Sequence, residues 1–241
     1  MKKIFLYIVS IFLLCSSVLV AQKKERVEYL PNEDKKLLHF GYYLGVNQKS
    51  FKVKYNNTLP LDLSNPNFLT VDESIGFNIG LVVDYKLHEN INLRFEPGLS
   101  SNTKTLTFNS QSIPNTENDM VRKVPATYLR MPLLLKFSTN RLDNIRPFVI
   151  GGVSYDYNFS SNQNNALDNS QGQFRMKTHN FMYEIGVGVD IYLIFFKFSP
   201  SIRGVFAINN ELVPDFDPNS NWTGPIDYFG TRGVFLNFTF Q

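Results

Sequence analysis

Alternating apolar and polar residues recur in about eight segments of this 241-residue chain, and the connections between the segments are alternately short and long. An apolar segment of the signal-peptide type stands at the N-terminus. Together these observations predict an all-β fold: a closed antiparallel transmembrane β-barrel of about eight strands, preceded by a signal peptide. Residues 38–241 are expected to form the barrel.

The N-terminal segment has the three-part layout of a secretory signal peptide. Lys2 and Lys3 precede an apolar run over residues 4–14, and the small residue Ala21 marks the expected cleavage site. A membrane anchor is less well supported, because the apolar run is short for a span. Residues 1–21 are therefore interpreted as a signal peptide.

The composition of the mature chain argues against disulfides and nucleic-acid binding. Cys15, the only cysteine, lies in the expected signal peptide, so the mature chain would have no disulfide and no cysteine metal site. Without Lys2 and Lys3 the chain has 22 basic and 21 acidic residues, a balance that gives nucleic-acid binding no support. Residues 22–37 are charged and show no buried pattern, and we interpret them as a flexible periplasmic lead-in.

We expect eight stretches to form strands, and nearly all of them show the period-two alternation of a strand with two unlike faces. In chain order they are HFGYYLGVN (39–47), FNIGLVVDYKL (77–87), INLRFEPGL (91–99), TYLRMPLLLKF (127–137), RPFVIGGVSYDYNF (146–159), NFMYEIGVGVDIY (180–192), FFKFSPSIRG (195–204) and RGVFLNFTFQ (232–241). Each is near the ~9–11 residues that a tilted strand needs to cross a bilayer. The stretch 146–159 is apolar on both faces, so its orientation is left open.

The stretch 180–192 shows the two faces most clearly. Phe181, Ile185 and Val187 share an uncharged face, whereas Glu184 and Asp190 lie on the other. A charge on the lipid side of a barrel costs about 2–4 kcal/mol at mid-membrane. The uncharged face is therefore expected to contact lipid, and the charged face to line the lumen.

The connections distinguish a membrane barrel from a soluble β-sandwich, which would also show alternation. Three are short (88–90, 139–144 and 193–194), and four are long and polar (56–76, 109–122, 160–178 and 208–228). Short turns on one side and long loops on the other are typical of outer-membrane barrels. An even strand count would place both termini at the short-turn, periplasmic side of the outer membrane of a Gram-negative bacterium.

The expected lumen is too narrow for unpaired charges, because eight strands enclose a space that side chains fill. Simple hairpin registers place an acid opposite a base four times: Asp84 with Arg94, Glu96 with Arg130, Glu184 with Arg203, and Asp190 with Lys197. We therefore expect a locked ionic core rather than an open pore. The glycines at 186 and 188 are expected to leave room for these side chains.

The C-terminal third, KFSPSIRGVFAINNELVPDFDPNSNWTGPIDYFGTRGVFLNFTFQ, resembles the PorT family, as do RPFVIGGVSYDYNF and LHFGYYLGVN upstream. Members of that family are outer-membrane β-barrel proteins of the Bacteroidetes that are associated with type IX protein secretion and gliding motility. The resemblance covers most of the mature chain. It implies a role in secretion across the outer membrane, and it supplies no catalytic residues.

Enzymatic chemistry finds little support in the sequence. A hydrolase at the outer leaflet would need His179 with Ser160 or Ser161, and no acid is placed to orient that histidine. His39 and His88 fall on the periplasmic side. We expect no catalytic residues, and an outer-leaflet lipid-modifying enzyme is kept as an alternative.

No cofactor or metal site is expected either. The stretch DFDPNSN (215–221) resembles a calcium loop but lacks the glycine and the distal glutamate. His, Asp and Glu residues do not cluster at metal-ligand spacing. The glycines of GVGVD (186–190) lie in a strand pattern and precede no helix, which argues against nucleotide binding.

Trp222, the only tryptophan, is the candidate contact for a partner protein. It lies in the long connection 209–230. Aromatic anchors are common in protein interfaces, and aromatic belts at the membrane surface also use tryptophan; both interpretations stay open. The expected partners are outer-membrane lipids and other secretion-system proteins, and no nucleic acid.

The predicted function is a non-enzymatic component or assembly factor of a type IX secretion system. A general small porin-like barrel with a structural or adhesive role is the main alternative. In neither case does the sequence predict a reaction.

Overall fold

The computed structural model describes residues 27–56, 68–109, 120–165, 173–217 and 220–241. The expected signal peptide, residues 1–21, lies outside the described residues, as does the start of the expected lead-in. The described part contains β1 (Leu38–Tyr55), β2 (Leu69–Asp72), β3 (Ile75–His88), β4 (Ile91–Phe95), β5 (Gly98–Phe108), β6 (Val121–Ser138), β7 (Ile145–Asn158), β8 (His179–Tyr192), β9 (Lys197–Ala207) and β10 (Ile226–Phe240).

These strands close into an antiparallel barrel. Around the ring, β1 is followed by β10, β9, β8, β7 and β6. β6 pairs with both β4 and β5, and these two also pair with β3. β3 pairs with β1, which closes the ring. β4 and β5 form one wall strand interrupted at Glu96 and Pro97, and β2 and β3 form another interrupted at Glu73 and Ser74. Eight strands therefore form the ring, which confirms the predicted all-β barrel.

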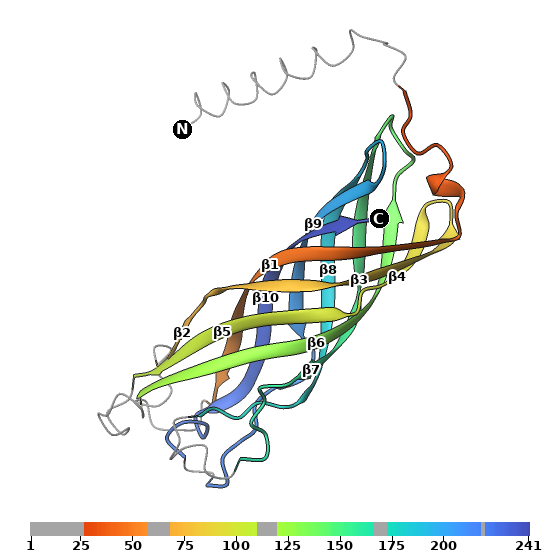
Figure 1. Cartoon of the computed structure of the whole chain (residues 1–241). Coiled ribbons are helices and arrows are strands. Elements are labelled where there is room, and N and C mark those ends of the chain that lie inside the picture. The colour runs from red at the N-terminus through yellow and green to blue at the C-terminus, as the bar shows by residue number, and fades with distance from the viewer. Residues whose placement is uncertain (1–26, 57–67, 110–119, 166–172, 218–219) are drawn as a thin grey trace, which may run out of the picture.

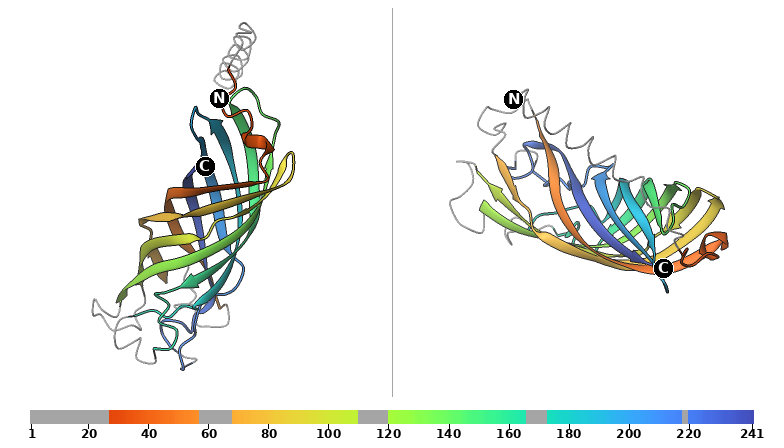
Figure 2. Two further views of the ribbon diagram at one scale, coloured as in Figure 1. Left: turned by 45° about the vertical axis from the view of Figure 1, so that its right-hand side comes forward. Right: turned by 90° about the horizontal axis from the view of Figure 1, so that it is seen from above.

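The two ends of the barrel differ, as the alternating connections predict. Figure 1 shows the short β3–β4, β6–β7 and β8–β9 turns at one end, together with Gln241 and the described N-terminal residues. The described residues of the long connections, among them 159–165, 173–178 and 208–217, lie at the other end (Figure 2). The described residues contain no helix with the length and apolar character that a membrane-crossing helix requires.

Apolar side chains cover the outer wall, and polar side chains line the lumen. Ile185 is 64% exposed, whereas its neighbour Glu184 is 4% exposed. The orientation of β7 is also clear, since Phe148 and Ile150 are buried and Val149 is exposed. The period-two prediction of the lipid-facing side is therefore confirmed, because alternate residues of a strand point to opposite faces.

The strands extend beyond the predicted ranges on the long-loop side. β2 lies inside the expected connection 56–76, and β10 begins at Ile226, inside the expected connection 208–228. These predicted bounds are wrong for a physical reason. Outward residues such as Lys52 and Lys54 are polar there, so the contrast between apolar and polar faces that marks a membrane strand disappears.

The described N-terminal residues contact the short-turn end of the barrel. A short 3₁₀ helix, η2 (Glu33–Lys35), places Asp34 next to two turns. The Asp34 carboxylate accepts hydrogen bonds from Arg146 at 3.1 Å and from the Tyr192 hydroxyl at 2.5 Å. The Tyr29 backbone N–H also donates to Asn144 at 2.9 Å. The described part of the predicted lead-in is thus joined to this end at several points.

Candidate functional site: the ionic lumen

The lumen is built in layers along the barrel axis. Nearest the long loops is an apolar cluster that strand residues share with loop residues: Phe51, Phe68, Leu69, Leu106, Phe108, Val124, Phe174, Met176, Leu212, Ile226 and Phe229. Below it lies an amide layer in which Asn47 donates to Asn78 at 3.3 Å and Asn78 bonds to Asn237. The ionic layer follows on the short-turn side.

One chain of alternating charges crosses the ionic layer. It begins at Asp84 on β3, which accepts a hydrogen bond from Arg94 Nε at 3.0 Å. Arg94 also donates to Glu96 at 3.4 Å, and Glu96 accepts from Arg203 Nη2 at 2.9 Å. All four side chains are buried.

The chain continues to the opposite wall through Glu184. This carboxylate lies 3.9 Å from Arg203 Nη1 and accepts a closer hydrogen bond from Arg130 Nη2. Arg130 Nε donates in turn to Asp156 at 3.0 Å. Seven buried charged side chains therefore connect β3 to β7 across the lumen, so the Coulombic attraction within each contact offsets the desolvation of its partners.

A second buried pair lies beside this chain. Lys136 on β6 donates to both carboxylate oxygens of Asp190 on β8, at 2.8 and 2.6 Å. The Ser199 hydroxyl donates to the same carboxylate at 2.6 Å. Lys136 Nζ also lies 4.2 Å from the centre of the Phe148 ring, a cation–π arrangement that partly replaces lost hydration.

The structure places all eight predicted lumen residues inside the barrel, but it pairs them differently. Asp84 and Arg94 are opposite each other, as the hairpin register indicates. The predicted Glu96–Arg130 pair is wrong, because Gly98 is the residue opposite Arg130. Glu96 lies two residues away and reaches Arg203 instead.

The predicted register of the β8–β9 hairpin is also shifted by two residues. Tyr192 is opposite Lys197, and Gly186 is opposite Arg203. Among the described residues no ion pair joins Lys197 to Asp190, although both are buried. A shift of two residues keeps every side chain on its face, so the lumen residues were predicted correctly. The predicted Glu184–Arg203 pair is present at 3.9 Å, whereas the described residues show no ion pair between Glu96 and Arg130 or between Asp190 and Lys197.

The glycines of β8 leave room for lumen side chains, as expected. A Cβ atom at Gly186 would lie 2.7 Å from Arg203 Cγ, and one at Gly188 would overlap the Phe148 ring. Gly186 thus accommodates a predicted lumen residue, whereas Gly188 accommodates an aromatic ring that the sequence left unassigned.

Sequence reasoning missed several buried charges. Asp156 lies in the strand whose orientation the sequence leaves open, and the sequence predicts no partner for Lys136. Lys49, Lys104 and Glu211 lie nearer the long-loop end. Lys104 Nζ lies 3.7 Å from the centre of the Phe51 ring. The alternation of β5 beyond Leu99 could have located Lys104, but its outward residues are serines and threonines, so the signal is weak.

Glu211 enters the barrel from the β9–β10 connection. Its carboxylate accepts a hydrogen bond from the Thr231 hydroxyl at 2.7 Å. Burial raises the pKa of this carboxyl, and the hydrogen bond from Thr231 and the attraction of Lys104 oppose that effect. Glu211 thus ties the long connection to the strand wall.

Trp222 is half-buried rather than fully exposed. Its ring packs against the apolar cluster of the long-loop end, and the Arg122 guanidinium lies 4.7 Å from the ring centre. Phe216, in the same connection, is 81% exposed, so it is the more accessible aromatic residue there.

Among the described contacts, none joins His179 to Ser160 or Ser161, the residues that a hydrolase would need. His179 Nδ1 and the Tyr155 hydroxyl share a hydrogen bond of 2.6 Å, while the Ser161 hydroxyl bonds to Thr178 at 2.8 Å. Within the described ranges, no group of three or more His, Cys, Asp and Glu side chains is arranged to hold a metal ion. In the stretch 215–221, Asp215 pairs with Arg175 at 3.1 Å.

A comparison with protein families agrees with this architecture. A family model described as outer membrane protein beta-barrel domain matches residues 20–213. The chain is similar to the crystal structure of the outer membrane protein OprG from Pseudomonas aeruginosa, with 14% identity over 83% of this chain and 92% of that chain and a TM-score of 0.45.

Two further solved structures are similar at lower scores. Neisserial surface protein A has 6% identity, coverage of 85% and 98%, and a TM-score of 0.42. The outer membrane enzyme PagL has 10% identity, coverage of 82% and 97%, and a TM-score of 0.38. No curated protein matches the chain.

Proposed function

The chain belongs to the family of outer membrane protein β-barrel domains, and on this premise we propose that it is a non-enzymatic component or assembly factor of a type IX protein-secretion system. In this proposal the barrel is anchored in the outer membrane with both termini in the periplasm. It acts through its surfaces and its long loops rather than through a reaction or a pore.

The observation that carries the proposal is the chain of buried charges across the lumen. Side chains from β3, β6, β7, β8 and β9 meet there in contacts of hydrogen-bond or ion-pair length. Solute passage would require breaking several buried pairs, each costing about 3–5 kcal/mol when one partner is left unpaired. A barrel of this kind is suited to a scaffold or assembly role.

The specific assignment to secretion rests on the resemblance of the C-terminal third to the PorT family. Its central part is the β9–β10 connection, which carries Trp222, Phe216 and the buried Glu211. Glu211 and the apolar cluster hold this connection against the barrel, so it can present a defined surface to a partner.

Deletion of the protein tests the proposal. We expect cargo proteins to accumulate in the periplasm and to disappear from the medium, and the wild-type chain to restore secretion. Proteomics of both fractions measures this. The lipid A composition is compared in parallel: a change in lipid A with normal secretion would favour a lipid-modifying enzyme, and an unchanged cargo distribution would contradict the secretion role.

Trp222 is proposed to contribute to partner docking. Trp222→Ala is expected to lower secretion and partner co-purification while the barrel still inserts and resists heat in detergent. Phe159→Ala is a matched control, because it truncates an exposed aromatic residue of another long connection. Normal secretion by Trp222→Ala with an intact barrel would exclude Trp222, whereas failure to insert would indicate a packing role.

A further inference from the structure

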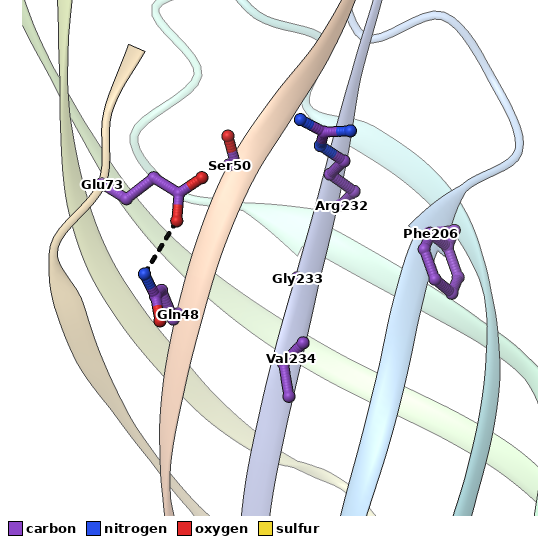
Figure 3. A pocket seen from close by; sticks show the side chains of 7 residues that line it. All are labelled: Gln48, Ser50, Glu73, Phe206, Arg232, Gly233 and Val234. Atoms are coloured by element: carbon purple, nitrogen blue, oxygen red, sulfur yellow. Dashed lines mark hydrogen bonds between the residues drawn. The ribbon is translucent and has the colours of Figure 1, made fainter. Parts of the chain in front are cut away.

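A groove opens on the outer wall where β3 separates from β1. The last paired residues are Gln48 and Ile75, after which Glu73 and Ser74 lead away to β2, which pairs with β5. Gln48 Nε2 donates to the Glu73 carboxylate at 2.9 Å and bridges the two strands at this point. The groove has a volume of about 300 Å³, and its lining includes Gln48, Ser50, Glu73, Phe206, Arg232 and Val234 (Figure 3).

The groove lies at the upper border of the apolar belt. Gln48 is flanked across the sheet by Ile75 and Val234, which are 78% and 51% exposed. Further toward the long loops, outward positions carry the polar side chains of Ser50 and Arg232. This change from apolar to polar is where lipid headgroups meet a membrane protein.

The groove presents one positive and one negative group. Arg232 is exposed and has no hydrogen-bonded or charged partner in the part of the chain that the structure describes. Among the described residues, Gln48 is the hydrogen-bond partner of the Glu73 carboxylate. Figure 3 shows them on opposite sides of β1, Glu73 beside the strand break and Arg232 on β10. A guanidinium binds phosphate oxygens well, and a carboxylate accepts hydrogen bonds from a primary ammonium.

An apolar groove continues from the same place toward the middle of the membrane. Val234 lines both grooves, and the second one, of about 400 Å³, also includes Ile185, Val187, Ile202 and Gly204. Gly204 is opposite Val234 on one side and Ile185 on the other. Glycine has no side chain of its own, and the Phe206 ring lies over this position, since its Cε2 would be 2.9 Å from a Cβ atom at Gly204. Phe206, which lines the first groove, therefore lies beside both grooves.

We propose that the two grooves together bind one lipid molecule with a phosphoethanolamine headgroup. The phosphate contacts Arg232, the ammonium group contacts Glu73, and an acyl chain lies along Val234 and Ile202. A headgroup with a phosphate alone would match only Arg232 and would be repelled by the Glu73 carboxylate. This inference does not depend on the role in secretion.

Native mass spectrometry of the folded full-length chain in detergent tests the site. Phosphatidylethanolamine, phosphatidylglycerol and phosphatidylcholine with identical acyl chains are added in turn, and the bound lipid is counted. We expect phosphatidylethanolamine to bind best. Loss of one charge-assisted contact corresponds to roughly a tenfold weaker affinity, so Arg232→Gln should weaken its binding about tenfold.

Two further variants separate a specific site from general lipid adhesion. Glu73→Gln should remove the preference for phosphatidylethanolamine over phosphatidylglycerol. Lys123→Gln neutralises an exposed cation on β6 and should change nothing. Equal binding of all three lipids, or unchanged binding by Arg232→Gln, would overturn the proposal. Displacement of the lipid by inorganic phosphate at equal concentration would indicate a phosphate site instead, which also overturns it.

Discussion

Arginine supplies the cations of the charge chain in the lumen, because the geometry of its guanidinium suits a narrow barrel. Arg94, Arg130 and Arg203 each contact two acids at once. The guanidinium is planar, remains charged and offers several donors in a fixed fork, whereas a lysine ammonium is a compact and strongly hydrated charge. Three arginines can therefore link four acids into one chain, and each acid orients the next arginine.

The pairing of Glu184 can be measured directly. The structure places Arg130 closer to it than Arg203. In double-mutant cycles with Glu184→Gln, Arg130→Met should show a larger coupling energy than Arg203→Met. Glu184→Gln alone should cost less than the about 3–5 kcal/mol of an isolated buried pair, because Arg130 keeps its contact with Asp156 and Arg203 keeps its contact with Glu96. Urea unfolding of the reconstituted barrel gives these values, and a larger coupling to Arg203 would contradict the observed arrangement.

Glu211 makes the stability of the long-loop end dependent on pH. Its folded pKa lies above the ordinary value of 4.5 because the carboxyl is buried. Its contribution to stability is therefore fully present below pH 4.5 and is lost as the pH rises through the folded pKa. Glu211→Gln should gain stability relative to the wild type as the pH rises from 4 to 8, measured by thermal unfolding. Asp227→Asn, at an exposed carboxylate of β10, is the control.

Among the elements, the β8–β9 hairpin shows how neighbouring strands share the narrow lumen. Gly186 lies directly opposite Arg203, and a side chain there would meet both Arg203 Cγ and the Ile202 carbonyl. Glycine weakens a strand by its conformational freedom, but here it lets a long cation fold into the lumen. The hairpin thus has a lower local strand propensity at Gly186, and in return the Arg203 side chain fits into the ionic layer.

Gly186→Ala is therefore expected to destabilise the barrel by about 1–3 kcal/mol through overpacking. Gly151→Ala is the matched control, because a Cβ atom there would meet only the Glu184 carbonyl at 3.3 Å. The midpoint of urea unfolding compares the two variants. Equal and small effects would show that Arg203 can move aside.

At the scale of the whole molecule, the two ends of the barrel are stabilised by different interactions. An apolar cluster packs at the long-loop end, and Asp34 hydrogen-bonds Arg146 and Tyr192 at the short-turn end. The apolar outer wall between them places the molecule in the outer membrane, since exposed apolar belts of this size are stable only in lipid.

The proposed orientation predicts which connections a protease reaches. A protease added to intact cells should cut only in the long connections, for example at 159–178 or 208–225, because the described residues of these connections lie at the long-loop end. Mass spectrometry of the released peptides identifies the cleavage site. Cleavage between Thr139 and Asn144 while the outer membrane is sealed would reverse the orientation.

The sequence by itself determined the strand number, the lipid-facing side and the identity of the predicted lumen charges. These follow from the period of two, which is a local property of an extended backbone. It also found the Asp84–Arg94 pair, because these residues face each other across a short turn. It did not reveal the orientation of β7, whose two faces are both apolar, and it therefore missed Asp156.

Only the tertiary structure decided which charges meet. Closure of the barrel brings strands that are not neighbours within reach of a long side chain, so Arg130 on β6 contacts Glu184 on β8, and Arg203 on β9 contacts Glu96. It also decided where β3 separates from β1 and opens the groove at Arg232. Periodicity is local, whereas pairing across a lumen depends on the closed ring and its register.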